Sequence, residues 1–416
     1  MGLVGNFSPP GDKSISHRIV LLSLLARGMA RVTNLSPGKD VLSSLRAVAG
    51  LGVNVMAVGG RLAIKGAAGR FARRAHIDCV NSGTTMRLLM GILAGTPGEF
   101  VLDGDSSLRN RPMERVAGPL RLMQARVETM SGKCPVSISG GNLQAISCEL
   151  AVASAQVKSA LLLAGVHAEG TTTITEPVSA RDHTERLLAS FGADIWREGR
   201  SWSVVRSELT LPDSFHVPSD ISSAAFLLCA ACIVPGSHVI AEGVLLNPTR
   251  TGFLEVLRRM GADIRVEIQQ EAPEPMGNVE ARYSPDLTGC DIAGAEVPSL
   301  VDEVPILALV ATQAHGVTRF RDAGELRVKE SDRLEAVREQ LSLLGACIAI
   351  DGDDLVIEGP ARFTTPDRLN SFGDHRMAMT LRLAGLLANA EPDIDGEESV
   401  AISYPGFRHA LKELMR

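Results

Sequence analysis

The sequence predicts a mixed α/β protein with two domains, each made of three copies of one helix–strand unit. Three observations support this fold class. The chain has 416 residues, 45% of them hydrophobic, and is long enough to form two cores. A polar start that leads into an aliphatic helix recurs six times, on average about 72 residues apart. A glycine turn that leads into a β-rich segment follows most of these helices.

Each unit begins with polar or acidic residues directly before an apolar helical run, which is the signature of a helix N-cap. The six starts are residues 12–14, 81–84, 154–156, 218–220, 301–303 and 373–375. Their recurrence predicts six helices in equivalent positions.

The first helix of each unit is expected to end near a glycine, after which a β-strand begins. These strands are expected after Gly28, Gly98, Gly170, Gly236 and Gly316, over residues 31–33, 100–102, 171–174, 238–240 and 317–318. The sixth unit departs from this pattern, because Asn389 stands near the place of the glycine.

A second amphipathic helix follows and stops at a turn that enters another strand or strand pair. Four of these turns hold Gly52, Gly192, Gly261 and Gly345, and the turn at residues 124–126 lacks a glycine. A unit with two amphipathic helices can cover one face of a sheet. Six units therefore predict two groups of three, as two globular domains with a cleft between them.

Composition excludes some classes of protein. A net charge of −6 and an aromatic fraction of 4% argue against a nucleic-acid binder. Seven scattered cysteines suit reduced thiols in the cytoplasm, and we interpret Cys229 and Cys232, in an apolar run, as core residues. We expect neither a secretory signal nor a membrane span, because the apolar runs are short.

Several helix starts carry more polar groups than a cap needs. Lys13, Ser14 and Arg18 fall in the first turns of the first helix, and Ser14 and Arg18 share a face. His375 and Arg376 open the last unit. These starts are either ordinary caps or helix N-termini that bind anions through free N–H groups. The second interpretation suits substrates with several phosphates and carboxylates.

Two further segments are rich in charge. Arg109 and Arg111 stand in a Gly/Ser-rich stretch and either clamp an anion or belong to a solvated loop. Within residues 327–334 (RVKESDRL), a helix would place Lys329, Glu330 and Arg333 on adjoining faces, either as a surface ion-pair stripe or as part of a site. Asp302 and Glu303 open an apolar helix, as caps or as a proton acceptor near cations.

Together these segments resemble the 5-enolpyruvylshikimate-3-phosphate synthase family. The resemblance covers essentially the whole chain, in the family's order and spacing. The segments that carry it are residues 11–18 (GDKSISHR), 81–84 (NSGT), 111–112 (RP), 154–156 (SAQ), 327–334 (RVKESDRL) and 373–376 (GDHR).

The resemblance implies an inside-out α/β barrel of two domains, built from six βαβαββ-type repeats with three in each domain. The N-terminal domain would span residues 10–218, and the C-terminal domain residues 1–9 and 219–416. The active site would lie in the interdomain cleft, and closure of the domains would exclude water from it.

The resemblance also implies a reaction. The enolpyruvyl group of phosphoenolpyruvate would pass to the 5-hydroxyl of shikimate 3-phosphate, through a tetrahedral intermediate that expels phosphate. This is a transferase step of chorismate and aromatic amino acid biosynthesis, and the target of glyphosate. The implied protein is a cytoplasmic monomer whose partners are these two small molecules, without nucleic acid, membrane, metal or other cofactor.

The roles of single residues follow from the resemblance by position. Asp302 would accept the hydroxyl proton, Glu330 would protonate C3 of phosphoenolpyruvate, and Lys13 would also be catalytic. Glu303 adjoins Asp302, so a slip by one residue stays open. The residues implied for shikimate 3-phosphate are Lys13, Ser14, Arg18, Ser154, Gln156, Arg181, Asp302 and Lys329. Those implied for phosphoenolpyruvate are Lys13, Gly83, Arg111, Gln156, Arg333 and Arg376.

Two alternative functions remain. The first is transfer of enolpyruvate to UDP-N-acetylglucosamine, whose enzymes usually carry a cysteine where this chain has Ser106 and Lys-Asn where it has Lys13-Ser14. The second is a non-catalytic anion-binding protein on the same fold. One departure concerns Ile402, which stands where many family members have a lysine that contacts phosphoenolpyruvate.

Overall fold

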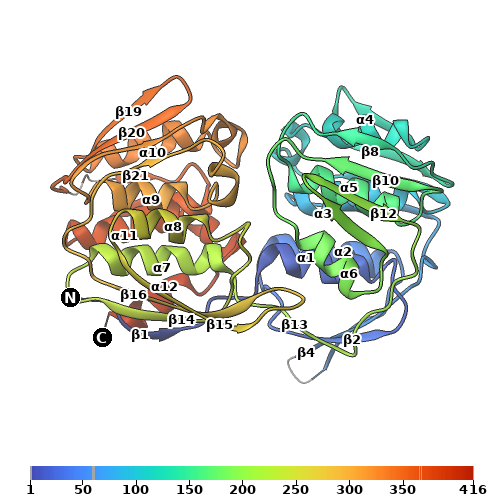
Figure 1. The fold of residues 1–416 in the computed structure, drawn as a ribbon, viewed down its shortest axis with the longest axis horizontal. Helices are drawn as coiled ribbons and strands as arrows, with labels where there is room; N and C mark the ends of the chain where they lie inside the picture. Colours follow the sequence, from blue (N-terminus) through green and yellow to red (C-terminus); the bar gives the residue numbers. More distant parts are fainter. Residues whose placement is uncertain (1, 59–60, 365, 367, 416) are drawn as a thin grey trace. The chain divides into compact units, whose positions relative to one another are not determined.

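The chain forms two compact units, and the polypeptide passes between them twice. The computed structural model describes residues 2–58, 61–364, 366 and 368–415. One unit, called here the N-terminal unit, is Gly11–Val217 (Figure 1, blue to green), and the other, the C-terminal unit, combines Met1–Pro10 with Pro218–Arg416. Residues 1 and 416, which the predicted C-terminal domain includes, lie outside the described residues.

Six inner helices begin at the six predicted starts. The N-terminal unit contains α1 (Lys13–Leu22), α3 (Gly83–Ala94) and α5 (Ala155–Gly165). The C-terminal unit contains α7 (Ile221–Ile233), α9 (Val304–Ala311) and α11 (His375–Leu387). Side chains cap five of them by accepting a backbone N–H of the first turn, namely Asp12, Ser82, Ser154, Asp220 and Asp374. Five of the six starts are therefore side-chain N-caps, whereas no side-chain cap is seen at Glu303, before α9.

The described part of the N-terminal unit contains three four-stranded sheets of one topology. In each sheet a parallel pair is extended by two antiparallel strands. The first sheet has the order β13 (Ser214–His216), β2 (Met29–Thr33), β4 (Arg61–Lys65) and β3 (Val55–Val58). The second has the order β5 (Arg74–Asp78), β6 (Gly98–Asp103), β8 (Lys133–Gly140) and β7 (Arg126–Met130). The third has the order β11 (Ile195–Glu198), β12 (Ser201–Val205), β10 (Thr171–Thr175) and β9 (Ser147–Glu149).

The described part of the C-terminal unit repeats this topology twice and ends with a reduced copy. Its third sheet keeps only the parallel pair, so the sixth repeat departs from the others as its sequence suggests. The first sheet has the order β1 (Val4–Phe7), β14 (His238–Leu245), β16 (Met276–Arg282) and β15 (Asp263–Gln270). The second has the order β17 (Asp291–Ile292), β18 (Gly316–Phe320), β20 (Asp354–Gly359) and β19 (Cys347–Asp351). The third pairs β21 (Arg368–Asn370) with β22 (Asp393–Asp395).

The remaining helices flank the sheets. The second helices of the repeats are α2 (Lys39–Gly50), α4 (Glu114–Leu122), α6 (His183–Ser190), α8 (Gly252–Arg259), α10 (Arg333–Leu343) and α12 (Phe407–Leu414). Short 3₁₀ turns are η1 (Leu108–Asn110), η2 (Val297–Ser299), η3 (Gly324–Val328) and η4 (Glu397–Ile402).

The predicted glycine turns all adopt left-handed backbone, which explains their recurrence. The two turns that lack glycine adopt it as well. Asn389 has a φ of 52° and Gln124 a φ of 69°. Asparagine tolerates this region, whereas glutamine has no such advantage.

Each unit has an aliphatic core around its inner helices. Every residue of α7 and of α9 is buried. Cys229 and Cys232 lie inside α7, where burial raises the pKa of the Cys232 thiol to about 12, so both are core residues as expected. Among the described residues, no helix has both the length and the apolar character needed to cross a membrane.

Candidate active site

The residues implied for the site divide between the two units. The N-terminal unit holds Lys13, Ser14, Arg18, Gly83, Arg111, Ser154, Gln156 and Arg181. The C-terminal unit holds Asp302, Lys329, Glu330, Arg333 and Arg376. Most of them stand at helix N-termini or in the loops beside them.

Helix α1 positions the first group. Lys13 is its first residue, and Nζ lies 3.3 Å from Oδ2 of Asp40 on α2. Arg18 is 4% exposed. Its guanidinium donates to the hydroxyls of Thr184 at 2.7 Å and Ser159 at 2.9 Å, and to the Ser14 carbonyl at 2.9 Å. Arg18 is therefore held by α5 and α6 as well as by its own helix.

A chain of buried polar groups joins the starts of α1 and α3. Nδ1 of His17 lies 2.8 Å from Oγ of Ser44, which lies 2.8 Å from Oγ1 of Thr85. The Thr85 hydroxyl donates to Oγ of Ser82, the N-cap of α3, at 2.8 Å. Burial, with nearby Lys13, lowers the pKa of His17 well below its ordinary value. The imidazole is thus neutral near pH 7. These hydrogen-bonded side chains connect the start of α1 to the start of α3.

The N-terminus of α3 forms a cationic recess around Gly83. A Cβ added at Gly83 would lie 3.0 Å from Nη1 of Arg87 and 3.4 Å from Nη1 of Arg111. Gln156 on α5 spans the same place, because its Oε1 accepts from Arg87 at 2.5 Å and its Nε2 donates to Thr84 Oγ1 at 2.9 Å. Two guanidinium groups therefore stand where the positive end of a helix dipole also favours an anion.

Sequence reasoning missed Arg87. It is the single charged residue of α3 and lies four residues after Gly83, so the two share a helix face. That spacing was the available signal. Of the two loop arginines, only Arg111 reaches the recess, where its Nη2 donates to Asn81 Oδ1 at 3.2 Å. Arg109 is more than half exposed and pairs with Asp103, which matches the solvated-loop interpretation.

The loop that carries Arg181 is held by a buried charge triad. Nζ of Lys158 lies 2.9 Å from Oε2 of Glu176 and 2.7 Å from Oε1 of Glu185, and all three side chains are at most 1% exposed. Lys158 also donates to the Ala180 carbonyl at 3.4 Å, and Glu176 Oε1 accepts the Ala180 N–H at 3.0 Å. The triad therefore grips both backbone polar groups of the residue that precedes Arg181.

In the C-terminal unit, Arg333 joins three carboxylates. Its Nε lies 2.7 Å from Oδ2 of Asp374, its Nη2 lies 2.6 Å from Oε2 of Glu330, and its Nη1 lies 3.3 Å from Oδ1 of Asp302. Arg376 donates to the Asp302 carbonyl at 3.2 Å and pairs with its Oδ2 at 3.3 Å. The cluster combines cations for anionic groups with carboxylates for proton transfer.

The protonation of this cluster follows from its charges. Burial disfavours the charged form of Arg333, but Asp374, Glu330 and Asp302 outweigh it and raise its pKa above the ordinary value. Burial likewise disfavours ionised Asp374, yet Arg333 keeps the pKa of that carboxyl below its usual value. Both groups are therefore charged near pH 7.

Asp302 and Glu303 have different surroundings. The Asp302 side chain is 16% exposed and contacts both arginines, whereas Glu303 is fully buried at the start of α9. Of the two adjacent carboxylates, Asp302 is the one that belongs to the Arg333 cluster.

Lys329, Glu330 and Arg333 do not lie on one helix. Residues 324–328 form η3, Lys329 has extended backbone, and α10 begins only at Arg333 behind the N-cap Asp332. Asp332 accepts the Glu335 N–H at 3.2 Å, so a helix start outcompetes continued helix here. Lys329 Nζ lies 3.4 Å from Oε1 of Glu325, and burial lowers the pKa of Lys329.

Comparisons with known proteins agree over the full length. Residues 2–411 match the family model described as EPSP synthase (3-phosphoshikimate 1-carboxyvinyltransferase). A 3-phosphoshikimate 1-carboxyvinyltransferase from Desulforudis audaxviator is 48% identical, covering 99% of this chain and 97% of its own, and one from Bacillus cereus is 43% identical, covering 100% and 97%.

Solved structures show the same fold. An EPSP synthase from Acinetobacter baumannii aligns with a TM-score of 0.89 and 41% identity, covering 99% of this chain and 96% of that one. The enolpyruvyl transferase NikO from Streptomyces tendae aligns with a TM-score of 0.81 at 20% identity, covering 100% and 95%, which concerns the fold alone. With its two units, its repeated sheets and these relatives, the chain belongs to the EPSP synthase family.

Proposed function

We propose that this chain transfers the enolpyruvyl group of phosphoenolpyruvate to the 5-hydroxyl of shikimate 3-phosphate and releases phosphate. The hydroxyl oxygen bonds to C2 while C3 gains a proton, which gives a tetrahedral intermediate. Loss of a C3 proton and of phosphate then restores the double bond. The observation that carries the proposal is the Arg333 cluster, where Asp302 and Glu330 share one guanidinium.

The two clusters supply different parts of this chemistry. Two substrates with phosphates and carboxylates need cations, and the Gly83 recess offers Arg87 and Arg111 beside a helix N-terminus. We assign phosphoenolpyruvate to this recess together with Lys13, Gln156, Arg333 and Arg376. We assign shikimate 3-phosphate to Lys13, Ser14, Arg18, Ser154, Gln156, Arg181, Asp302 and Lys329.

The ion pairs of Arg333 suggest how Glu330 becomes a proton donor. Without substrate, the Glu330 carboxylate is held by Arg333 at 2.6 Å. If the substrate carboxylate takes over that guanidinium, Glu330 loses a cation and gains an anionic neighbour. Both changes favour its protonated form. Asp302, which Arg376 contacts as well, accepts the hydroxyl proton in this proposal.

The test is phosphate release from phosphoenolpyruvate by the purified protein with either acceptor. We expect release with shikimate 3-phosphate and none with UDP-N-acetylglucosamine, since Ser106 and Ser14 stand where the sister enzymes differ. Release with the sugar nucleotide alone would overturn the acceptor. Release with neither would favour a non-catalytic anion-binding protein.

A second test concerns Glu330. Replacing Glu330 with Gln keeps its shape but removes the proton, so kcat should fall by about 10²–10⁴-fold, the usual range for a general acid. The matched control is Glu335→Gln, whose carboxylate pairs with exposed Arg338. Unchanged turnover in Glu330→Gln would remove the assignment.

We also propose a monomer in the cytoplasm. The seven cysteines are free, as thiols in a reducing compartment are. Light scattering during size-exclusion chromatography measures the molecular mass, and a dimer would contradict the proposed monomer.

We expect glyphosate to inhibit the enzyme, because Gly83 leaves room beside the two arginines. Ile402 ends η4, and we assign it no substrate contact.

A further inference from the structure

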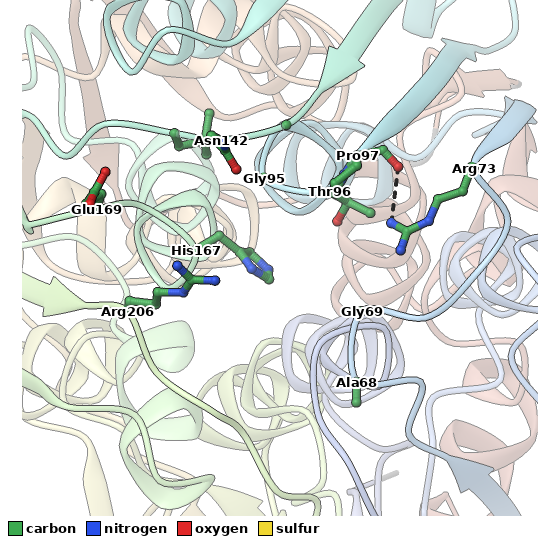
Figure 2. A pocket seen from close by; sticks show the side chains of 12 residues that line it. Ala68, Gly69, Arg73, Gly95, Thr96, Pro97, Asn142, His167, Glu169 and Arg206 are labelled. Carbon is green, nitrogen blue, oxygen red and sulfur yellow. Dashed lines mark hydrogen bonds between the residues drawn. The ribbon is translucent and has the colours of Figure 1, made fainter.

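The N-terminal unit contains a cavity of about 470 Å³ that holds none of the residues proposed for catalysis (Figure 2). Its charged and amide-bearing side chains are Arg73, Asn142, His167, Glu169 and Arg206. The cavity lies at the C-terminal ends of α3 and α5, whose N-terminal ends carry Gly83 and Gln156. Since α3 has 12 residues, the two places are roughly 18 Å apart.

The first reason to assign a ligand here is a pair of polar groups on one wall. Nε2 of His167 is buried and has no hydrogen-bond partner among the described residues. Figure 2 shows the Arg206 guanidinium beside this ring, facing the open space. A buried polar atom without a partner is costly, and arginine offers only donors. A ligand oxygen that accepts from both groups would satisfy them together.

The opposite wall adds a second cation. Arg73 lies across the cavity from Arg206 (Figure 2) and uses Nη1 to donate to the Pro97 carbonyl at 3.1 Å. This contact suits the negative end of α3, which attracts cations. The rest of the guanidinium remains available to the cavity. Glu169 is the single carboxylate among the lining residues, and it accepts from Gln144 Nε2 at 3.3 Å. Cations thus exceed anions in the lining.

The shape of the lining leaves room for a small molecule. A Cβ at Gly95 would lie 2.7 Å from Cβ of His167, so the imidazole is packed against the end of α3. By contrast, a Cβ at Gly141 would meet no atom within 4 Å. The volume falls within the range of small-molecule sites.

We propose that this cavity binds a small molecule with two anionic groups, carboxylates or phosphates, one held by Arg206 with His167 and the other by Arg73. A bound cation is the alternative that helix C-termini favour, but the positive charges of Arg73 and Arg206 oppose it. Near pH 7 the ring acts as a neutral donor, because burial, with Arg206 nearby, lowers the pKa of His167 to about 4.

The test follows the imidazole signal of His167 by NMR of histidine-labelled protein, assigned with a His167→Gln variant. Succinate represents compounds with two carboxylates and inorganic pyrophosphate represents compounds with two phosphates, and each is titrated separately. We expect at least one of them to move the His167 signal saturably. A bound anion stabilises the imidazolium, so the pKa of His167 should rise from about 4 toward its ordinary value.

Variants then locate the binding. Arg206→Ala should weaken it by roughly tenfold to a hundredfold, the value of a charge-assisted hydrogen bond. Gly141→Asp, which adds a negative charge without a clash, should weaken it too. Arg31→Ala, which removes an exposed arginine of β2, is the matched control. Far-ultraviolet circular dichroism and melting show that each variant is folded.

Two outcomes would overturn the proposal. One is a His167 signal that neither compound moves at saturating concentration. The other is an equal affinity in wild type and Arg206→Ala, which would place the anion elsewhere. A signal that Mg²⁺ moves and neither anion moves would mean the cation alternative. These readouts do not use enzyme activity, so they stand or fall separately from the proposed reaction.

Discussion

At the scale of single residues, the arginines of the two clusters differ in the groups that hold them. Arg333 holds three carboxylates at distances of 2.6 to 3.3 Å, so its charge is fully compensated until an anion competes for it. The Gly83 recess differs, because Arg87 and Arg111 are held there by amide and carbonyl oxygens. These partners of Arg333 are therefore carboxylates, and these partners of Arg87 and Arg111 are neutral oxygens.

The recess makes a prediction about Gly83. In Gly83→Ala the new methyl group would press on Nη1 of Arg87 at 3.0 Å and of Arg111 at 3.4 Å. Glyphosate separates its anionic groups by one atom more than phosphoenolpyruvate does, so a narrowed recess should hurt it more. We expect the inhibition constant of glyphosate to rise at least about tenfold, a cost of ~1.4 kcal/mol. The Michaelis constant for phosphoenolpyruvate should rise less.

Steady-state kinetics with glyphosate as inhibitor measure both constants. The control is Gly50→Ala, whose Cβ would meet no atom within 4 Å and which should change neither constant. Gly91→Ala is unsuitable, because its Cβ would lie 2.0 Å from the Ala160 carbonyl oxygen. An equal loss for glyphosate and phosphoenolpyruvate would show that the methyl group does not discriminate between them.

At the scale of elements, local signals predicted what local physics determines. N-caps and left-handed glycines act within a few residues, so the six helix starts and the glycine turns could be read along the chain. The Lys158 triad and the closing strand β13 could not, since their partners lie far away in sequence, whereas Arg87 was missed although its spacing from Gly83 could be read. The spacing of Lys329, Glu330 and Arg333 is compatible with one helix, but α10 begins only at Arg333, behind its N-cap Asp332.

Among the turns predicted to follow the helices, the one at Gln124 holds a poorly suited residue that can be improved. Gln124 has a φ of 69°, which costs an L-residue about 1–2 kcal/mol. Gln124→Gly removes this strain but loses about 0.5–1 kcal/mol to the greater freedom of glycine in the unfolded chain. We expect the free energy of unfolding, measured in urea, to rise by up to about 1 kcal/mol.

The opposite change serves as the control for the turn. Gly52 occupies the equivalent position, and a Cβ there would meet no atom within 4 Å, so Gly52→Ala reports backbone strain alone and should destabilise. Asn389→Gly should gain less than Gln124→Gly, because asparagine tolerates this conformation. If Gln124→Gly lowers stability, left-handed strain is not what limits this turn.

The Lys158 triad connects α5, α6 and the Arg181 loop, and it carries one cation for two carboxylates. Lys158→Met should destabilise the protein by about 3–5 kcal/mol, because it leaves buried carboxylates without their partner. It should also raise the Michaelis constant for shikimate 3-phosphate more than that for phosphoenolpyruvate, since Ala180 is released beside Arg181. Lys158→Arg should recover part of both losses.

Glu185→Gln tests the same triad through pH. Burial raises the pKa of Glu185 despite the opposing charge of Lys158. A carboxyl group with a raised folded pKa binds more protons in the folded state, so its contribution to stability is present at low pH and lost as pH rises through that pKa. The free energy of unfolding of wild type should therefore fall between acid and neutral pH. In Glu185→Gln this fall should be smaller. Parallel urea curves for the two proteins across that range would contradict this.

At the scale of the whole chain, each unit is completed by a strand from the far end of its own sequence range. β13 closes the first sheet of the N-terminal unit, and β1 does so in the C-terminal unit. Because β1 belongs to the chain's first residues, the C-terminal unit is discontinuous in sequence. β1 and its neighbours are held by residues more than 200 positions later in the sequence. One example is Ser237, whose hydroxyl accepts the Leu3 N–H at 2.9 Å.

This topology predicts that the C-terminal unit folds well alone only when β1 is supplied. Leu3 is fully buried and Phe7 is 7% exposed, and α12 packs against β1 near Gly5. A fragment of residues 218–415 lacks both side chains, which contribute about 3–6 kcal/mol together. A permuted fragment, in which a short flexible linker joins residue 415 to residues 2–10, should recover that amount in urea unfolding. A permuted fragment with Leu3→Asp should lose it again, while Asn6→Ala, at an exposed position on the same strand, should lose much less. Equal stability of the fragments with and without β1 would mean that this strand is dispensable to the unit.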